Sequence, residues 1–253
     1  MSPETTPKLR AILVDDEHLA RRYLRQLLEA HPDVEIVAEC ADGFEAVKAV
    51  DDHRPDLVFL DIQMPKLDGF EVLELIHHPV SVIFATAYDQ YALKAFDAHA
   101  VDYLLKPFSP QRLEESLLKV KRLHGSRAVA PEVASLRNDA RPEGAYLERV
   151  VIKDGAKIVF VPVEDIDYIS AEDDYVSVHS RDNSWLKHAT ISGLEDALNP
   201  AQFVRIHRST LVRVDRIQRI ERETKDRYVA LLKSGTQLAI SRSGHKRLKK
   251  LFR

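Results

Sequence analysis

The chain contains one cysteine among its 253 residues, Cys40, and no apolar run long enough to cross a membrane. A lone cysteine excludes an internal disulfide and fits a reducing compartment. Because Cys40 ends an apolar, strand-like run, we interpret it as a small buried hydrophobic residue and not as a nucleophile. A membrane-spanning helix needs roughly 20 consecutive apolar residues. The polar residues 1–4 lack the apolar segment of a signal peptide, so we expect a cytoplasmic protein with no membrane partner.

Basic charge is scarce at the front of the chain and concentrated at its end. Residues 1–124 carry 14 Lys and Arg against 22 Asp and Glu, a net charge of −8, whereas residues 145–253 carry 20 against 15, or +5. Within the latter, residues 205–253 hold 15 basic and 4 acidic residues, or +11. This asymmetry indicates two functions, and we expect the second to involve a polyanion.

The first 124 residues alternate apolar runs with segments of helical periodicity. The runs are almost wholly apolar, as strands covered on both faces must be. Alternating strands and helices predict an α/β fold with a doubly wound, five-stranded parallel sheet, because short βαβ crossovers are nearly always right-handed. The predicted strands are residues 11–14, 34–40, 57–61, 80–85 and 101–105, and the predicted helices are residues 19–28, 43–52, 69–77, 90–98 and 110–123.

The alternation stops after residue 124. Residues 125–145 contain scattered Gly and Pro with balanced charge, so we interpret them as a linker between a domain at 8–124 and one at 146–253. Beyond the linker the apolar period becomes two, and Asp154-Gly155 marks a hairpin, which predicts a mostly antiparallel β domain. Its predicted strands are residues 150–152, 158–161, 166–170, 175–179, 185–188, 203–206, 211–214, 217–221, 228–232 and 237–240, with helices at 192–198 and 244–252.

Polar side chains follow four of the apolar strands in the first domain. Asp15 and Asp16 follow the first strand, Asp61 the third, Thr86 the fourth and Lys106 the fifth. The carboxyl ends of parallel strands lie at one edge of the sheet, where open α/β folds place their sites. Three carboxylates so close repel one another unless a cation lies between them, which predicts a divalent metal site and phosphoryl chemistry. The simpler alternatives are that Asp16 and Thr86 cap helices and that Lys106 is a solvated loop charge.

These five residues, with Met64-Pro65, Asp68-Gly69 and Tyr103, resemble a response-regulator receiver domain over residues 8–124. The resemblance implies that a sensor histidine kinase phosphorylates Asp61 and that Mg²⁺ is required. Mg²⁺ is a hard cation that prefers oxygen ligands and usually keeps waters beside one or two carboxylates, so the chemistry agrees.

The same resemblance assigns a role to individual residues. Mg²⁺ would be held by Asp16, Asp61 and the backbone carbonyl of Gln63, with Asp15 assisting. The domain would promote only its own phosphorylation and dephosphorylation and would not otherwise be an enzyme. Contacts to the phosphoryl oxygens would come from Thr86 and Lys106, the conformational switch from Thr86 and Tyr103, and the homodimer surface from residues 88–123.

A second resemblance covers residues 146–253. The segments Ile169–Val176, Phe203–Ser209 and Ile240–Arg242 are similar to a LytTR-type DNA-binding domain, and the Phe-x-x-x-His-Arg-Ser run is the most specific of them. The resemblance implies a compact β domain that inserts loops, not a recognition helix, into successive major grooves of promoter DNA. The implied contacts lie in three loops and are Asp174, His207, Arg208, Ser209, Arg242 and Ser243.

The chemistry of these residues supports most of the implied contacts. Arg208 and Arg242 can each bond a guanine edge through two hydrogen bonds or hold a phosphate. Lys246 and Arg247 suit phosphates, which position a protein without reading sequence. The loop at Asp174 departs from the family, whose members usually carry amides or hydroxyls there. A carboxylate repels phosphate and can accept a hydrogen bond only from a donor such as cytosine N4.

Together the resemblances predict a phosphorylation-controlled, dimeric transcription factor. One alternative is a receiver whose basic β domain binds RNA or a protein partner, but aromatic residues for stacking single-stranded bases are sparse in the basic end. An enzymatic output is disfavoured because residues 146–253 contain no second carboxylate pair of the kind found in the first domain, no Ser/His/Asp set with defined spacing and no Gly-rich phosphate loop. A phosphatase built on Asp61 is disfavoured because Gln63, two residues later, is not acidic.

Overall fold

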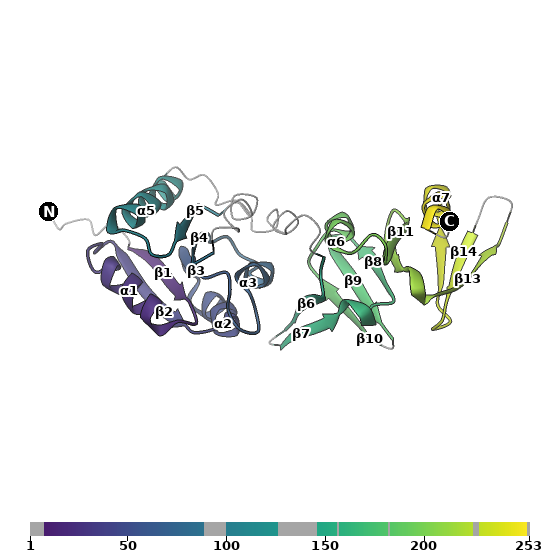
Figure 1. Ribbon diagram of the computed structural model, residues 1–253, viewed down its shortest axis with the longest axis horizontal. Helices are drawn as coiled ribbons and strands as arrows, with labels where there is room; N and C mark the ends of the chain where they lie inside the picture. The colour runs from purple at the N-terminus through teal and green to yellow at the C-terminus, as the bar shows by residue number, and fades with distance from the viewer. Residues whose placement is uncertain are drawn as a thin grey trace. The chain divides into compact units, whose positions relative to one another are not determined.

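The computed structural model describes residues 8–88, 100–125, 146–155, 157–181, 183–224 and 228–251. The chain divides into two compact units, Met1–Ala140 and Arg141–Arg253, which we call the N-terminal unit and the C-terminal unit and describe separately (Figure 1). The predicted helix at 90–98 and all but the first residue of the predicted linker lie outside the described residues. In the described ranges, no helix is long and apolar enough to span a bilayer.

The N-terminal unit is built on a five-stranded parallel sheet. Its strands are β1 (Leu9–Val14), β2 (Val34–Cys40), β3 (Leu57–Leu60), β4 (Ser81–Thr86) and β5 (Asp102–Leu105). Their order in space is β2-β1-β3-β4-β5, which confirms the predicted doubly wound sheet. Because β2 lies on one side of β1 and all later strands lie on the other, the order reverses between β1 and β3. Folds of this kind bind their ligands at that switch point.

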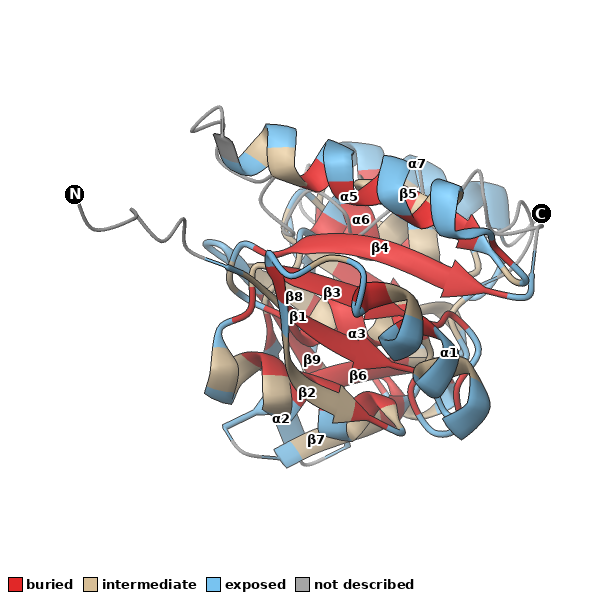
Figure 2. Cartoon of the chain, turned by 90° about the vertical axis from the view of Figure 1, so that its left-hand side faces the viewer, coloured by how far each residue is buried: buried red, intermediate tan, exposed pale blue. Residues whose placement is uncertain are grey.

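Helices cover both faces of this sheet. The described ones are α1 (His18–Leu28), α2 (Gly43–His53), α3 (Gly69–Leu75) and α5 (Pro110–Gly125). On one face, Leu13, Phe59 and Ile83 share a core cluster with Leu24 of α1 and Leu117 of α5. On the other, α2 contacts β1, β2 and α3. All residues of β3 and β4 are buried, as Figure 2 shows, which matches their continuous apolar sequence.

Burial settles two predictions about individual side chains. Cys40 is 2% exposed, and burial raises the pKa of its thiol to about 12, which confirms that it is a buried hydrophobic residue. In α1, by contrast, only part of the apolar stripe enters the core, since Leu19 is 74% exposed. Tyr23 is half-exposed, and its hydroxyl donates a 2.9 Å hydrogen bond to the backbone carbonyl of Phe108, which ties α1 to the loop after β5.

A buried carboxylate fixes α5 on β5. Asp102 accepts 2.7 Å hydrogen bonds from both terminal nitrogens of Arg112 and from the Ser116 hydroxyl, and Lys119 Nζ lies 2.9 Å away. Burial alone raises the pKa of Asp102, but these donors outweigh that effect and hold the pKa well below its usual range. The charges of this patch are therefore satisfied within the unit.

The C-terminal unit consists mainly of antiparallel strands, as predicted. They are β6 (Arg149–Asp154), β7 (Lys157–Pro162), β8 (Tyr168–Glu172), β9 (Tyr175–Ser180), β10 (Asn183–Lys187), β11 (Phe203–His207), β12 (Thr210–Arg213), β13 (Ile217–Arg222), β14 (Tyr228–Leu232) and β15 (Gln237–Ile240). In the described parts of the unit they form a five-stranded sheet ordered β10-β9-β8-β12-β11, a three-stranded sheet ordered β13-β14-β15, and the β6-β7 hairpin. That hairpin turns at Gly155 (φ +60°), which confirms the Asp154-Gly155 signal.

Two helices and two 3₁₀ turns complete this unit. They are α6 (Ile191–Ala197), α7 (Arg242–Leu251), η3 (Val163–Asp165) and η4 (Val214–Arg216), and only the two α-helices were predicted. Helix α7 packs very closely on β11, since a Cβ added at Gly244 would lie 2.0 Å from the carbonyl oxygen of Ile206. Glycine is required there because any side chain would push the helix off the strand.

Candidate functional site

The register of the parallel strands places the predicted residues of the first site side by side. Val14 at the end of β1 pairs with Leu60 at the end of β3. The backbone N–H of Asp61 then donates to the Val14 carbonyl at 2.9 Å, and that of Lys106 donates to the Thr86 carbonyl at 2.8 Å. We call the resulting group of five residues the acidic edge; it comprises Asp15, Asp16, Asp61, Thr86 and Lys106.

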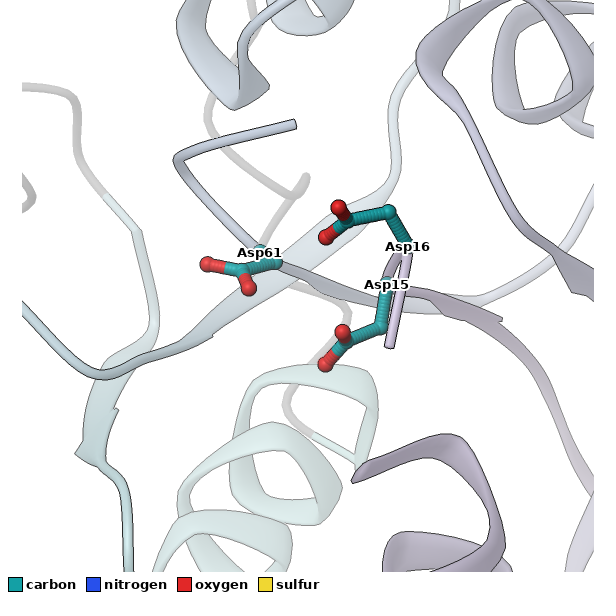
Figure 3. A group of neighbouring side chains, drawn as sticks. All are labelled: Asp15, Asp16 and Asp61. Carbon is teal, nitrogen blue, oxygen red and sulfur yellow. The ribbon is translucent and has the colours of Figure 1, made fainter. Parts of the chain in front are cut away.

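Three carboxylates gather at the ends of β1 and β3 (Figure 3). One oxygen from each of Asp15, Asp16 and Asp61 lies within 4.8 Å of the other two. Asp15 and Asp61 are each 6% exposed, whereas Asp16 is open to solvent. Mg²⁺ binds oxygen ligands at about 2.1 Å, so the carboxylates would move slightly inward around the ion. Their grouping and chemistry suit a hard divalent cation.

Lys106 joins two of these carboxylates. Its Nζ lies 2.5 Å from Asp15 Oδ2 and 2.9 Å from Asp61 Oδ2, and its side chain is 16% exposed. Burial alone lowers the pKa of Lys106, but the hydrogen bonds and charges of the two carboxylates outweigh burial and raise it. Burial also raises the pKa of Asp15, an effect that Lys106 only partly offsets. Lys106 is thus a fixed cation in the site, and the alternative of a solvated loop charge is wrong.

Backbone amides hold the second oxygen of each buried carboxylate. Asp15 Oδ1 accepts a 2.9 Å hydrogen bond from the N–H of Glu17, and Asp61 Oδ1 accepts one of 2.6 Å from the N–H of Ile62. In addition, Arg21 Nη1 donates to the backbone carbonyl of Asp15 at 2.5 Å, a contact that the sequence did not indicate. Both carboxylates are therefore oriented before any ligand arrives.

Thr86 places its side-chain hydroxyl in the interior of the unit. The residue is fully buried, and its Oγ1 has no hydrogen-bond partner among the described residues. An unsatisfied buried polar group costs about 1–3 kcal/mol, so a hydrogen bond from this hydroxyl to a ligand at the acidic edge would be favourable. The capping alternative is wrong for Asp16, because the N-cap of α1 is Glu17 and no side chain caps that helix.

Tyr103 is linked to the segment that follows Thr86. Its hydroxyl donates a hydrogen bond to the backbone carbonyl of Tyr88, and its side chain is half-buried. Strand β5 is thereby connected to the loop two residues beyond the end of β4.

The start of α3 explains the predicted Asp68-Gly69 pair. A Cβ added at Gly69 would lie 2.5 Å from the backbone carbonyl oxygen of Asp61, so glycine lets the helix begin against the acidic edge. Asp68 caps the helix and exchanges hydrogen bonds with Glu71, and burial raises the pKa of Asp68 to about 6. Gln63 lies in the intervening loop and its side chain is exposed.

The three predicted DNA-contacting loops of the C-terminal unit lie next to one another. The N–H of Ala171 donates to the Ser209 carbonyl at 2.9 Å, which places the β8–β9 turn beside the β11–β12 turn. The N–H of Ser241 donates to the Ile206 carbonyl at 2.8 Å, which places the start of α7 beside the same turn. We call these segments, residues 173–174, 207–209 and 241–243, the loop edge.

The side chains at the loop edge are mostly exposed. His207 Nδ1 lies 2.8 Å from the Ser209 hydroxyl, so this histidine is tied to its own turn and is not a core residue. Asp173 has a φ of +52° within the β8–β9 turn. The predicted contact residues that are exposed are Asp174, Arg208, Arg242, Ser243, Lys246 and Arg247.

Among the predicted contacts, Arg247 has an anionic partner from another helix. Its Nη1 lies 3.1 Å from Oε1 of Glu195, a residue of α6. Glu195 also binds Arg205, at 2.9 Å, so the carboxylate neutralises part of the basic end. Sequence reasoning missed this network, since an acidic residue on a short amphipathic helix looks like an ordinary solvated charge.

Comparisons with known proteins match both units. The response regulator receiver domain matches residues 11–118, and the LytTr DNA-binding domain matches residues 156–253. The sensory transduction protein LytT of Bacillus anthracis is 36% identical over 248 residues, which cover 97% of this chain and 99% of the relative. The transcriptional regulatory protein BtsR of Salmonella typhi is 34% identical over 245 residues, covering 95% and 98%. The solved response regulatory domain of mrkE from Klebsiella pneumoniae is 33% identical, with a TM-score of 0.44, and covers 47% of this chain and 99% of that one.

The relatives match along nearly their whole length, so they share the order of the two domains as well as each domain. Neither domain match supports the alternative in which the β domain binds RNA or a protein partner. The chain belongs to the two-component response regulators that join a receiver domain to a LytTR DNA-binding domain and act as DNA-binding transcription factors.

Proposed function

We propose that Asp61 accepts a phosphoryl group from a sensor histidine kinase and that this group controls how the C-terminal unit binds promoter DNA. The observation that carries the proposal is the contact of Lys106 Nζ with Asp61, at 2.9 Å, at the same edge as the Thr86 hydroxyl, which has no partner in the described part of the chain. A phosphoryl group on Asp61 would supply oxygens for both donors. We assign the receiver to residues 8–124, the linker to 125–145 and the DNA-binding domain to 146–253.

In the phosphoryl transfer, a carboxylate oxygen of Asp61 attacks the phosphorus of the kinase phosphohistidine. A new O–P bond forms, the P–N bond breaks, and the imidazole leaves. Lys106 offsets negative charge on the phosphoryl oxygens, and the Thr86 hydroxyl donates to one of them. Mg²⁺, held by Asp16, Asp61 and the Gln63 carbonyl with Asp15 assisting, would offset the remaining charge. The receiver catalyses only this reaction and the hydrolysis of its own phosphoaspartate.

Phosphorylation of Asp61 changes the conformation of the receiver through Thr86 and Tyr103. A hydrogen bond from Thr86 to the phosphoryl group satisfies its buried hydroxyl, which favours movement of Thr86 toward Asp61. That movement displaces the backbone around Tyr88, whose carbonyl accepts the Tyr103 hydroxyl. Tyr103 then turns inward, and the surface around β5 changes shape.

The same surface supports a homodimer of the phosphorylated protein. In the described part of the 88–123 face, Leu105 and Leu118 are each 45% exposed. Asp102 is paired with α5 within its own unit, and we propose that the two exposed leucines make apolar contact with a second copy. A dimer presents two DNA-binding domains to paired half-sites and gains affinity through effective concentration.

At the DNA, we assign base reading to Arg208 and Arg242, with His207, Ser209 and Ser243 beside them. Lys246 and Arg247 hold phosphates, and Asp174 weakens the contact of its turn with the backbone. Since promoter DNA and the kinase's phosphorylated domain are both reached from the cytoplasm, we place the protein there.

The proposal is tested by labelling the full-length protein with acetyl phosphate in the presence of Mg²⁺. Asp61→Asn should abolish labelling, because an amide is not a nucleophile for phosphorus. The matched control is Asp52→Asn, which makes the same change at an exposed position of α2 and should label like the wild type. Labelling of Asp61→Asn at the wild-type level would contradict the assignment of the phosphoacceptor.

A further inference from the structure

Helix α6 carries a carboxylate that joins two guanidinium groups from other elements. Glu195 Oε2 lies 2.9 Å from Nη1 of Arg205 on β11, and Glu195 Oε1 lies 3.1 Å from Nη1 of Arg247 on α7. The Glu195 side chain is 33% exposed and that of Arg205 is 20% exposed. One acidic side chain therefore connects α6, β11 and α7 close to the loop edge.

Arg205 passes this connection on to the β11–β12 turn. Its Nη2 donates a 2.6 Å hydrogen bond to the backbone carbonyl of Arg208, and its Nη1 also donates to the Ser192 hydroxyl at 2.9 Å. The Arg205 guanidinium thus binds two side chains of α6 and the backbone of the β11–β12 turn. The carbonyl that it binds belongs to the residue whose side chain we assign to base reading.

The position of Glu195 is costly for general attraction to DNA. Residues 205–253 carry a net charge of +11, and an acidic group that pairs with two of their arginines lowers the affinity for any polyanion. Without Glu195, Arg205 and Arg247 would repel each other, since one Nη1 atom of each lies within 3.1 Å of the same carboxylate. Arg205 would then lose the charged partner that keeps it on the turn.

We propose that Glu195 is a positioning residue for sequence-specific DNA recognition: through Arg205 it fixes the backbone of the 207–209 turn and presents Arg208 in one orientation. This inference rests on the proposed function, in which that turn contacts DNA. It predicts an effect of unusual sign, because removing an acidic group from a DNA-binding domain ordinarily strengthens binding. Here the removal weakens specific binding and leaves non-specific binding intact.

The test compares two duplexes of equal length and base composition. One is enriched by the wild-type, full-length protein from a random-sequence pool, and the other is its scrambled version. For Glu195→Ala we expect about a 10-fold loss of affinity for the enriched duplex and a change within about 2-fold for the scrambled one. The matched control is Asp196→Ala, which removes the same charge from the adjacent, exposed position of α6 and should slightly strengthen binding to both. Glu195→Gln, a smaller perturbation of the fold, should fall between Glu195→Ala and the wild type.

A double mutant identifies the route through Arg205. In an Arg205→Ala background, Glu195→Ala should change affinity for the enriched duplex less than about 2-fold, because the group that Glu195 holds is already gone. If Glu195→Ala strengthens both duplexes as Asp196→Ala does, or weakens both equally, Glu195 is a surface charge or a stabiliser of the fold and the inference is overturned. Failure of the wild type to enrich any duplex would instead contradict the proposed function.

Discussion

The acidic edge and the loop edge are both assembled where strands end, yet they hold their charges in opposite ways. At the acidic edge, Lys106 lies in buried contact with Asp15 and Asp61. At the loop edge, Arg208 is exposed, and its contact with the rest of the unit runs through its backbone. Group transfer needs charges fixed in advance in a dry site, whereas DNA recognition needs cations that are free to meet phosphates and base edges. We therefore expect the removal of one charge to have a larger effect at the acidic edge than at the loop edge.

The largest effect is expected from the buried cation. Lys106→Ala should slow labelling by acetyl phosphate about 100-fold, because removing one donor to a developing anion typically costs that much. The control is Lys48→Ala, which removes an exposed lysine of α2 and should leave the rate unchanged. Rates are measured with Mg²⁺ at saturation, so that loss of the metal does not mimic loss of the lysine.

Labelling of Lys106→Ala at the wild-type rate would show that Lys106 only balances charge in the resting protein. The contrast between the two edges would then disappear, since a buried cation would contribute no more than an exposed one.

A smaller effect is expected at the loop edge, and it should depend on DNA sequence. Arg208→Ala should weaken binding to the enriched duplex about 5- to 100-fold, the range for a side chain that reads a base edge. Lys249→Ala, on the exposed side of α7, should weaken all duplexes about 2-fold and make the affinity less dependent on salt. Equal losses for the two variants, on both duplexes, would mean that Arg208 touches phosphate alone.

The acidic edge is easier to predict from the sequence than the loop edge, because the two edges depend on contacts of different sequence separation. Asp61, Thr86 and Lys106 were recognised because parallel strands align their own carboxyl ends, so the next residue of each strand is already in place. The loop edge depends on the pairing of β8 with β12 and on the fit of Gly244 against Ile206. Nothing local in the sequence specifies those contacts.

Long-range electrostatic partners were missed for the same reason. Glu195 and Arg205 are ten residues apart, on a helix and a strand whose packing is set by the tertiary fold. The pairing of Arg247 with Glu195 likewise joins two helices that are far apart in the sequence. The sequence thus identified which residues carry charge at the basic end but not which of those charges are already paired.

The smallest effect is expected at the acidic turn of the loop edge. Asp174→Asn should strengthen binding to every duplex by about 2-fold at low salt, and the gain should fade as salt screens the removed repulsion. The measurement is a salt titration of affinity for the enriched and scrambled duplexes. A loss confined to the enriched duplex would indicate instead that Asp174 accepts a hydrogen bond from a base.

The central claim is that the acidic edge controls the loop edge, and one measurement tests it directly. The affinity for the enriched duplex is determined before and after treatment with acetyl phosphate and Mg²⁺, for the wild type and for Asp61→Asn. We predict that treatment strengthens binding by the wild type about 10-fold or more, within the usual range of coupling between two sites, and leaves Asp61→Asn unchanged. Equal affinity of labelled and unlabelled wild-type protein would contradict the account.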